Sequence, residues 1–414
     1  MDQLIVNTGF PILSALLFLP LLAAGMLFLI KSETGQKWFT LIATGLTALM
    51  ALKLIWGFDR ASSAYQFAEL HSWIDAPKIQ YALGVDGISI LLVLMTAFIM
   101  PFCVLVSWTY IKDRIRTYMI CLLLMETAML GVFMALDFVL FYVLWEAMLI
   151  PMYLLIGIWG GPRRIYASVK FFLYTLTGSI LLLVAIIWLY TANNYSFFIP
   201  DMAWQHYSMT AQTCLFVAFF LAFAIKVPMF PFHTWLPAAH VEAPTAGSVI
   251  LASILLKMGA YGFLRFALPI TPDATLQFLP YVLALSIAGI IYGGFTALAQ
   301  NDMKKLIAYS SVGHMGFVTL GIFVLNQEGI EGAILQMINH GITTGALFLC
   351  IGMIYERTHS RELLSATGVG KVMPVFVTFL TFFGLSSFAF PGTNSFVGEF
   401  MILAGTFKII LVWP

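Results

Sequence analysis

The chain has 414 residues, of which 61% are hydrophobic and only 9% are charged, and its formal net charge at pH 7 is +1. A soluble core does not need this much apolar sequence, so the composition indicates a polytopic membrane protein. The small net charge gives no sign of a nucleic-acid partner. The cysteines stand singly, without the Cys/His spacing of a metal, haem or iron–sulfur site.

About twelve stretches of about 20 apolar residues predict membrane-spanning helices. In chain order they lie near 10–30, 38–57, 88–110, 117–136, 138–159, 168–191, 212–239, 245–268, 279–300, 306–325, 330–354 and 372–413. The seventh span contains Pro228, Pro231 and Pro237, and the twelfth contains Phe390-Pro391-Gly392. Proline removes a backbone donor and clashes with the preceding turn, so both spans are predicted to be broken.

Lysines and arginines gather in alternate loops, whereas the loops at 192–211, 269–278 and 326–331 contain neither. By the positive-inside rule the N-terminus lies outside and the basic loops are cytoplasmic. The basic residues of these loops are Lys31, Lys37, Lys112, Arg114, Arg116, Arg163, Arg164, Lys304, Lys305, Arg357, Arg361 and Lys371. Arg60 and Lys78 are exceptions, in a longer outer loop (59–86) that we expect to form a hairpin or short helices.

The whole chain, 1–414, is predicted to be a single transmembrane domain. Pro228 and Pro391 are separated by nearly the same number of residues as the starts of spans four and nine. This spacing predicts N-terminal helices in 1–116, a first repeat in 117–268 and an incomplete second repeat in 279–414. Units of five helices contain an odd number of crossings, so the two repeats would be inverted relative to each other.

Ionisable side chains lie near the middle of six predicted spans. A charge at bilayer depth costs several kcal/mol on insertion scales, so it is rarely left there without a partner or a function. These residues are Glu146, Lys226, Lys257, His314, His340 and Glu399. A bundle could align them as one polar axis along the membrane plane.

The chemistry of these residues favours protons. Burial disfavours the charged form of a lysine and a nearby carboxylate favours it, so Lys226 opposed by Glu146 is a tunable pair. Histidine carries protons between such groups because its ordinary pKa is near neutral. Glu126, Lys170, His233 and His240 are further candidates for the relay. The structural alternatives are a static buried ion pair, core histidines and a carboxylate at a helix terminus for Glu399.

Four long strings resemble the proton-translocating, antiporter-like subunits of respiratory complex I. They are Lys226-Val-Pro-Met-Phe-Pro-Phe-His-Thr-Trp-Leu-Pro-Ala-Ala-His240, Lys304-Lys-Leu-Ile-Ala-Tyr-Ser-Ser-Val-Gly-His314, His340-Gly-Ile-Thr-Thr-Gly-Ala-Leu-Phe348 and Phe390-Pro-Gly-Thr-Asn-Ser-Phe-Val-Gly-Glu399. Within that family, Gly84-Val-Asp-Gly-Ile-Ser89 and Tyr355-Glu-Arg-Thr-His-Ser-Arg361 look most similar to the M type, the mitochondrial subunit 4 type.

The resemblance implies an all-α fold of fourteen helices with two inverted five-helix repeats and discontinuous helices seven and twelve. It implies that Glu146 and Lys226 form the charge pair, that Lys257 is the central relay, that His340 belongs to the connecting axis and that Glu399 lies on the exit side. The chain ends at Pro414 in an apolar stretch, so we expect helices thirteen and fourteen to be missing from it.

The resemblance also implies that this chain binds no cofactor and no metal, because FMN, iron–sulfur clusters and quinone belong to other subunits. The expected partners are other membrane-arm subunits, including neighbouring antiporter-like ones, and the lipid bilayer. The expected location is the bacterial cytoplasmic (inner) membrane, with the mitochondrial inner membrane as the alternative. The alternatives are a subunit of a multi-subunit cation/proton antiporter or of a membrane-bound hydrogenase-type complex, and a purely structural subunit.

Overall fold

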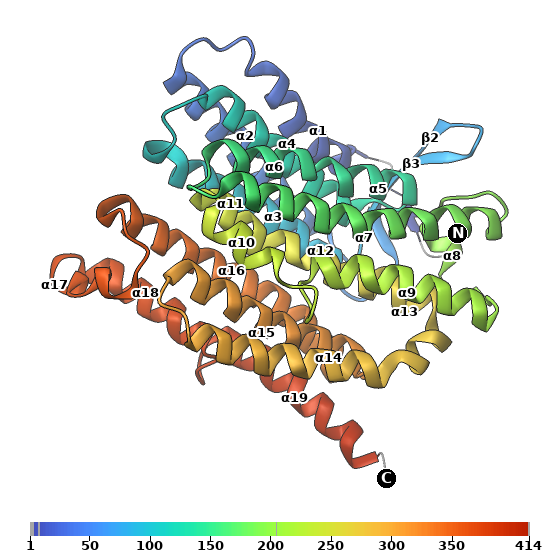
Figure 1. Cartoon of the computed structure of the whole chain (residues 1–414). Helices are drawn as coiled ribbons and strands as arrows, with labels where there is room; N and C mark the ends of the chain where they lie inside the picture. The colour runs from blue at the N-terminus through green and yellow to red at the C-terminus, as the bar shows by residue number, and fades with distance from the viewer. Residues whose placement is uncertain (1–3, 7–8, 204, 413–414) are drawn as a thin grey trace.

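The computed structural model describes residues 4–6, 9–203 and 205–412, in which long helices run side by side along one direction (Figure 1). Trp413 and Pro414, at the apolar chain end, lie outside the described residues. The first half comprises α1 (Ile12–Met26), α2 (Glu33–Gly57), α3 (Ser89–Tyr110), α4 (Ile115–Met134), α5 (Phe138–Ala147), α6 (Leu149–Trp159), α7 (Arg164–Ala192), α8 (Ile199–Met202) and α9 (Met209–Lys226).

The second half continues through α10 to α19. These helices are α10 (Trp235–Glu242), α11 (Thr245–Ile250), α12 (Leu256–Gly262), α13 (Leu268–Ile270), α14 (Pro272–Leu298), α15 (Met303–Phe323), α16 (Gln327–Thr358), α17 (Val369–Val372), α18 (Pro374–Ser387) and α19 (Asn394–Val412). Two π-helical turns, Leu251–Leu255 and Phe263–Ala267, join α11, α12 and α13 into one rod, and a 3₁₀ turn (Leu363–Ala366) precedes α17.

Within the described residues, ten helices are long and apolar enough to cross a membrane, and α1 and α18 are shorter apolar helices. The prediction of a helical, polytopic membrane fold is therefore confirmed. Some helices extend beyond the apolar stretches that predicted them. The α2 helix begins at Glu33, before its apolar run, because the Ser32 hydroxyl accepts a hydrogen bond from the Gly35 amide and caps the helix.

Three short strands lie at one end of the bundle, opposite the end that carries α17 (Figure 1). They are β1 (Leu4–Val6), β2 (Tyr65–Ile74) and β3 (Ile79–Val85), paired in the order β1-β2-β3, with β1 parallel to β2 and β2 antiparallel to β3. The outer loop at 59–86 is therefore a hairpin, one of the two forms expected for it.

An ion pair fastens the hairpin to the bundle. Arg265 donates to the Asp86 carboxylate at 2.6 Å and to the Tyr65 hydroxyl at 2.9 Å. The side chains of Arg265 and Asp86 are only 10% and 13% exposed. Burial would raise the pKa of Asp86, but the Arg265 guanidinium and hydrogen bonds from Arg265 and Ser89 outweigh it, so the pKa is lowered.

The backbone is interrupted after Lys226, where α9 ends and eight residues pass before α10 begins at Trp235. The polar groups freed at this break find partners within the protein. The Met229 amide donates to the Ala224 carbonyl at 2.9 Å, and the Trp235 indole donates to the Ile225 carbonyl at 2.8 Å. Such compensation is required because a buried, unpaired backbone group is costly.

A second interruption separates α18 from α19. Gly392 adopts a positive φ of 97°, which glycine tolerates without a steric penalty, and the Phe390 amide donates to the Leu385 carbonyl at 3.1 Å. The Asn394 side chain at the start of α19 donates to the Asn339 side chain on α16 at 3.1 Å. This contact fixes the start of α19 against the middle of α16.

The hairpin is expected to loosen when its ion pair is removed. Asp86→Asn leaves Arg265 buried without its counter-charge and should destabilise the attachment of β3 locally by about 3 kcal/mol. Hydrogen exchange of peptides covering 79–88 in the purified protein measures this loss of protection. Asp75→Asn in the hairpin turn is the matched control, because among the described residues the Asp75 carboxylate accepts a hydrogen bond only from the Ser72 hydroxyl.

The Arg265–Asp86 ion pair also sets how the protection of the hairpin from hydrogen exchange depends on pH. Since the pKa of Asp86 is lowered in the folded protein, its stabilising effect is fully present above the ordinary aspartate pKa of about 3.9 and is lost only as the pH falls below it. Equal protection at pH 5 and pH 7 is expected in the unmodified protein. A loss of protection between those two values would contradict this assignment.

Candidate functional site

The six mid-span ionisable residues come together in two separate groups. The first group contains Glu146 on α5 and Lys226 at the end of α9. The second group contains Lys257 on α12, His340 on α16, His314 on α15 and Glu399 on α19. Each group consists of side chains from different helices, so its geometry depends on how those helices pack.

In the first group, Lys226 is 2% exposed and its ammonium group has no hydrogen-bond partner among the described residues. The ammonium lies over the Trp145 ring, 4.6 Å from the ring centre, and the Trp145 indole donates to the Ser179 hydroxyl at 3.0 Å. No ion pair within 4.0 Å joins Lys226 to Glu146 in the described structure, and one buried carboxylate oxygen of Glu146 has no partner. The cation–π contact is thus the direct stabilisation of this lysine.

Helix α12 packs directly against the break after α9. A Cβ atom on Gly259 would lie 2.8 Å from the Phe223 carbonyl oxygen and 2.9 Å from the Val227 amide nitrogen. Only glycine permits this approach of two backbones. It places the helix that carries Lys257 beside the end of the helix that carries Lys226.

In the second group, Lys257 and His340 are both buried and in contact. The Lys257 ammonium nitrogen lies 2.6 Å from His340 Nδ1 and donates to the Ala252 carbonyl at 2.5 Å. The π-helical turn at Leu251–Leu255 widens the helix just before Lys257, so the Ala252 carbonyl can accept from a side chain. Two nitrogens this close together favour a single shared proton, because two cations would repel each other.

His314 and Glu399 form the other contact of the second group. His314 Nδ1 lies 2.8 Å from Glu399 Oε1, and Gln336 donates to the same oxygen at 2.8 Å. The His314 and His340 rings are 5.6 Å apart, centre to centre, and His340 Nε2 has no hydrogen-bond partner in the described part of the chain. Ser387, at the end of α18, lies 3.4 Å from His314 Nε2. A short gap between imidazoles therefore separates Lys257–His340 from His314–Glu399.

The four remaining candidates lie apart from these contacts. Glu126, on α4, is fully buried and neither carboxylate oxygen has a partner in the described structure. His233 contacts the rings of Phe230 and Tyr292, and Lys170 lies between Tyr166 and Tyr174. His240 stacks on Phe348, with ring centres 4.5 Å apart, and both its ring nitrogens are buried without partners. The structure does not bring these four into hydrogen-bond contact with either group.

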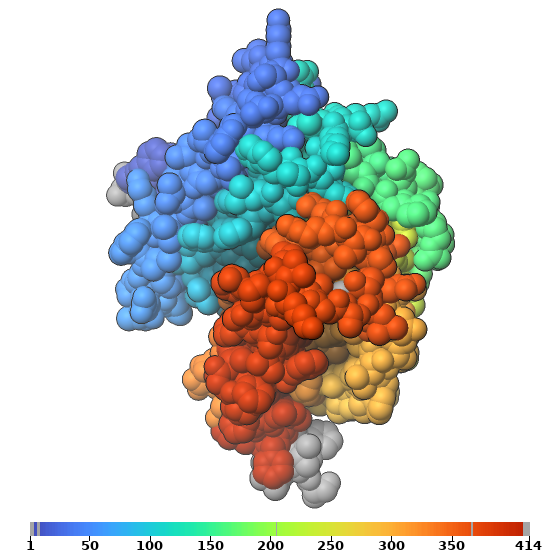
Figure 2. Space-filling view, turned by 90° about the vertical axis from the view of Figure 1, so that its left-hand side faces the viewer, coloured from blue at the N-terminus to red at the C-terminus, as the bar shows by residue number. Residues whose placement is uncertain are grey.

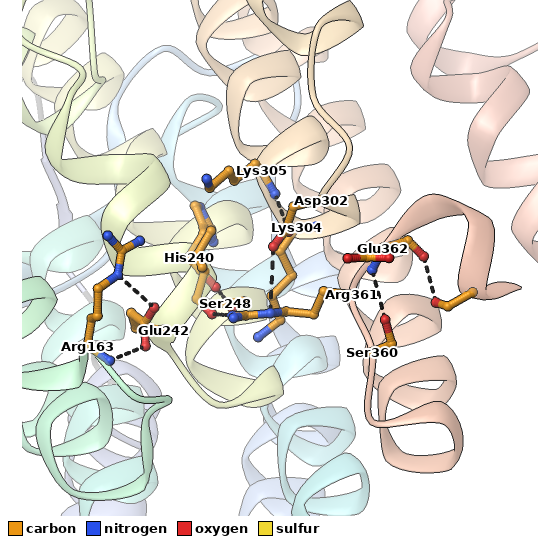
Figure 3. Close-up of polar contacts among 12 residues, drawn as sticks. Arg163, His240, Glu242, Ser248, Asp302, Lys304, Lys305, Ser360, Arg361 and Glu362 are labelled. Atoms are coloured by element: carbon orange, nitrogen blue, oxygen red, sulfur yellow. Dashed lines mark hydrogen bonds and ion pairs between the residues drawn. The ribbon is translucent and has the colours of Figure 1, made fainter.

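A polar cluster holds the C-terminal end of α10 (Figure 3). Lys304, at the start of α15, donates to the Ala243 carbonyl at 2.8 Å, and Arg361 donates to the Val241 carbonyl at 2.5 Å. Arg361 also lies 3.6 Å from Asp302, whose carboxylate caps α15. These bonds satisfy carbonyl groups at the end of a short helix.

Sequence reasoning missed several side chains of the site because they are not ionisable. Trp145, Ser179, Gln336 and Ser387 each contact a candidate residue or its neighbour. Trp145 directly precedes Glu146 in the chain, and that adjacency was the available signal. Within the described residues, no group of three or more histidine, cysteine, aspartate or glutamate side chains could hold a metal ion.

Comparison with known proteins gives consistent matches. Residues 135–413 match the family model described as NADH:quinone oxidoreductase/Mrp antiporter, TM. The chain is 50% identical to NADH-quinone oxidoreductase subunit M of Rhodobacter capsulatus, over 96% of this chain and 81% of that protein. A chain of respiratory complex I from Thermus thermophilus with bound NADH superposes with a TM-score of 0.88 and 32% identity, over 96% of this chain and 82% of that one.

A further structural match indicates the fold alone. A chain of the Mrp complex from Dietzia sp. DQ12-45-1b superposes with a TM-score of 0.84 but is only 22% identical, over 95% of this chain and 43% of that one. The fold is therefore shared between a respiratory complex and an Mrp complex, and it does not by itself decide the function.

The contact at Gly259 gives a test of how the two lysine helices are held together. Gly259→Ala should destabilise the protein by about 1–3 kcal/mol, because the added methyl group meets backbone atoms that cannot rotate away. The measurement is the thermal stability of the detergent-purified protein. Gly294→Ala on α14 is the control: nothing lies within 4 Å of the added Cβ there, so stability should hold or rise slightly.

Proposed function

The chain belongs to the NADH:quinone oxidoreductase/Mrp antiporter transmembrane family, within it to the M subunits of NADH-quinone oxidoreductase, and from that premise we propose that its two polar groups relay protons. The observation that carries the proposal is the pair of contacts Lys257–His340 and His314–Glu399, built from four different helices around mid-span positions. A protein that only filled space would have no use for these buried charges.

The proposed transfer begins at the first group. Lys226 has no hydrogen-bond partner among the described residues, so its charged form depends on the Trp145 ring and on the more distant Glu146 carboxylate. A change of charge or position at Glu146 would therefore alter how readily Lys226 holds its proton. Glu146 is only partly buried, which leaves it open to the influence of a neighbouring subunit.

A proton released from Lys226 would pass next to Lys257. Lys257 and His340 can exchange one proton across their 2.6 Å contact without moving either backbone. His340 Nε2, which no described residue contacts by a hydrogen bond, is the group available to pass the proton towards His314, and Glu399 then accepts it. Water molecules would bridge the two spaces between lysines and between imidazoles.

The chain is a subunit of the respiratory enzyme and works among other membrane-arm subunits of complex I in the bacterial inner membrane. We propose that the electron-transfer centres (FMN, iron–sulfur clusters and quinone) are held by other subunits and that this chain binds none of them. The free energy of electron transfer would then act on this chain through a change of charge or conformation in a neighbouring subunit.

Loss of the Lys226 ammonium group is expected to stop proton movement. Lys226→Met should lower NADH-driven proton uptake into inverted membrane vesicles by about tenfold or more, because no other group of the described protein replaces the lost proton carrier. Lys53→Met is the matched control, since Lys53 also lies within an apolar helix, α2, but is exposed on its surface. Native gels verify that both variants assemble.

Two outcomes would contradict the proposal. Full proton uptake by an assembled Lys226→Met complex would show that Lys226 has only a structural role. Sodium movement in vesicles without NADH would instead favour the cation/proton antiporter alternative. NADH oxidation by an artificial electron acceptor should stay normal in both variants, because that activity reports the redox subunits alone.

A further inference from the structure

Ser253 lies where the rod that carries Lys257 touches α16. It belongs to the π-helical turn Leu251–Leu255, and its hydroxyl donates to the Gly341 carbonyl at 2.8 Å. The face of the molecule in Figure 2 is formed largely by segments from the two ends of the chain, coloured blue to cyan and orange to red. Ser253 is fully buried, so its hydroxyl needs a partner within the protein.

The π-helical turn approaches α16 closely because α16 has glycine at two positions about one turn apart. A Cβ atom on Gly341 would lie 3.1 Å from the Ser253 carbonyl oxygen. A Cβ atom on Gly345 would collide with the Ser253 hydroxyl oxygen, whereas the next nearest atoms, on α11 and α3, would lie 3.7 and 3.8 Å away. The space for this hydroxyl therefore depends on glycine at position 345.

The hydrogen bond of Ser253 joins the two segments that supply the partners of Lys257. One partner is the carbonyl of Ala252, which precedes Ser253 in the chain. The other is Nδ1 of His340, which precedes Gly341. Lys257 itself lies on α12, which packs mainly on α9, whereas α11 and the π-helical turn pack against α16. The 2.6 Å contact between Lys257 and His340 therefore depends on how this turn is held against α16.

We propose, on the basis of the proton relay described above, that Ser253 is a positioning residue that keeps the Lys257 ammonium within proton-sharing distance of His340. A hydrogen bond weakens steeply as its geometry departs from the optimum, so a small movement of the π-helical turn away from α16 would weaken the contact. The Ser253 hydroxyl has one hydrogen, which it donates to the Gly341 carbonyl. Ser253 thus acts on proton transfer through the geometry of its neighbours.

The alternative is that Ser253 only stabilises the packing of two helices. Such a role would change thermal stability but not the pH dependence of proton uptake, because that dependence reports the groups that hold the proton. The titratable groups within the bundle on the helices around the lysine–histidine pair are Glu126, Lys226, His240, His314 and Glu399. Ser253 donates to none of them, so a changed pH profile in a Ser253 variant would report the pair itself.

The test is NADH-driven proton uptake into inverted membrane vesicles that contain the assembled complex, measured as a function of pH. Ser253→Ala should lower uptake by about threefold, because a methyl group cannot hold the π-helical turn against α16. The alkaline limb of the profile should move to lower pH by about half a pH unit, since a loosened pair holds its shared proton less firmly.

Ser168→Ala is the matched control for the loss of a buried hydroxyl. Ser168 is also fully buried, but its hydroxyl donates to the Ile165 carbonyl of its own helix, α7, at 3.0 Å. Uptake and its pH profile should therefore stay unchanged in this variant. Native gels verify that each variant assembles.

Gly345→Ala is an independent probe of the same contact, because its methyl group would displace the Ser253 hydroxyl. It should reproduce both effects of Ser253→Ala. The double variant should be no worse than either single variant, since the displaced hydroxyl is then already absent. Ser253→Ala carries the test alone if Gly345→Ala does not assemble.

Two outcomes would overturn the positioning role. One is an assembled Ser253→Ala complex with the uptake and pH profile of the unmodified complex, and the other is additive losses in the double variant. Lys257→Met should abolish uptake if the relay operates. Full uptake by an assembled Lys257→Met complex would instead overturn the relay, so the two failures are distinguishable.

Discussion

The constraint on which the rest of the structure depends is the need to satisfy backbone groups at the break after Lys226. Trp235 supplies a donor to the Ile225 carbonyl, and the Met229 amide turns back to Ala224. These bonds end α9 at Lys226 and keep its ammonium over the Trp145 ring. They also place α10 so that Lys304 and Arg361 can satisfy its last carbonyls. The broken helix α9–α10 therefore runs from the buried Lys226 to the contacts with Lys304 and Arg361.

Much of the fold follows from the sequence because hydropathy, proline and charge act over short ranges. The apolar stretches predict the helices, and Pro228 and Pro391 lie at interruptions that the structure contains. The ends of helices are harder to predict from hydropathy. The Ser32 cap lets α2 begin in a polar turn, which a hydropathy profile would assign to a loop. The hairpin depends on a pair distant in sequence, Arg265 and Asp86, which no local pattern identifies.

The sequence singles out the buried ionisable residues, but it does not reveal which of them are in contact. Lys257 and His340 stand out because each lies in an apolar stretch, yet their 2.6 Å contact depends on how α11 and the following π-helical turn pack against α16. The contact between His314 and Glu399 also depends on the packing of helices that are distant in the chain, so the sequence alone does not reveal it. Lys226 and Glu146, predicted as a tunable pair, form no direct ion pair within the described residues, and the lysine ammonium lies over the Trp145 ring. Their roles in proton transfer remain a proposal.

The length of α16 has a mechanical consequence. A helix from Gln327 to Thr358 is about 48 Å long, whereas the hydrocarbon core of a bilayer is about 30 Å thick, so it must tilt or protrude. His340 lies near its middle, and Arg357 lies about 25 Å away at one end. Tilting the rod about its centre would barely displace the imidazole but would swing the guanidinium through a wide arc.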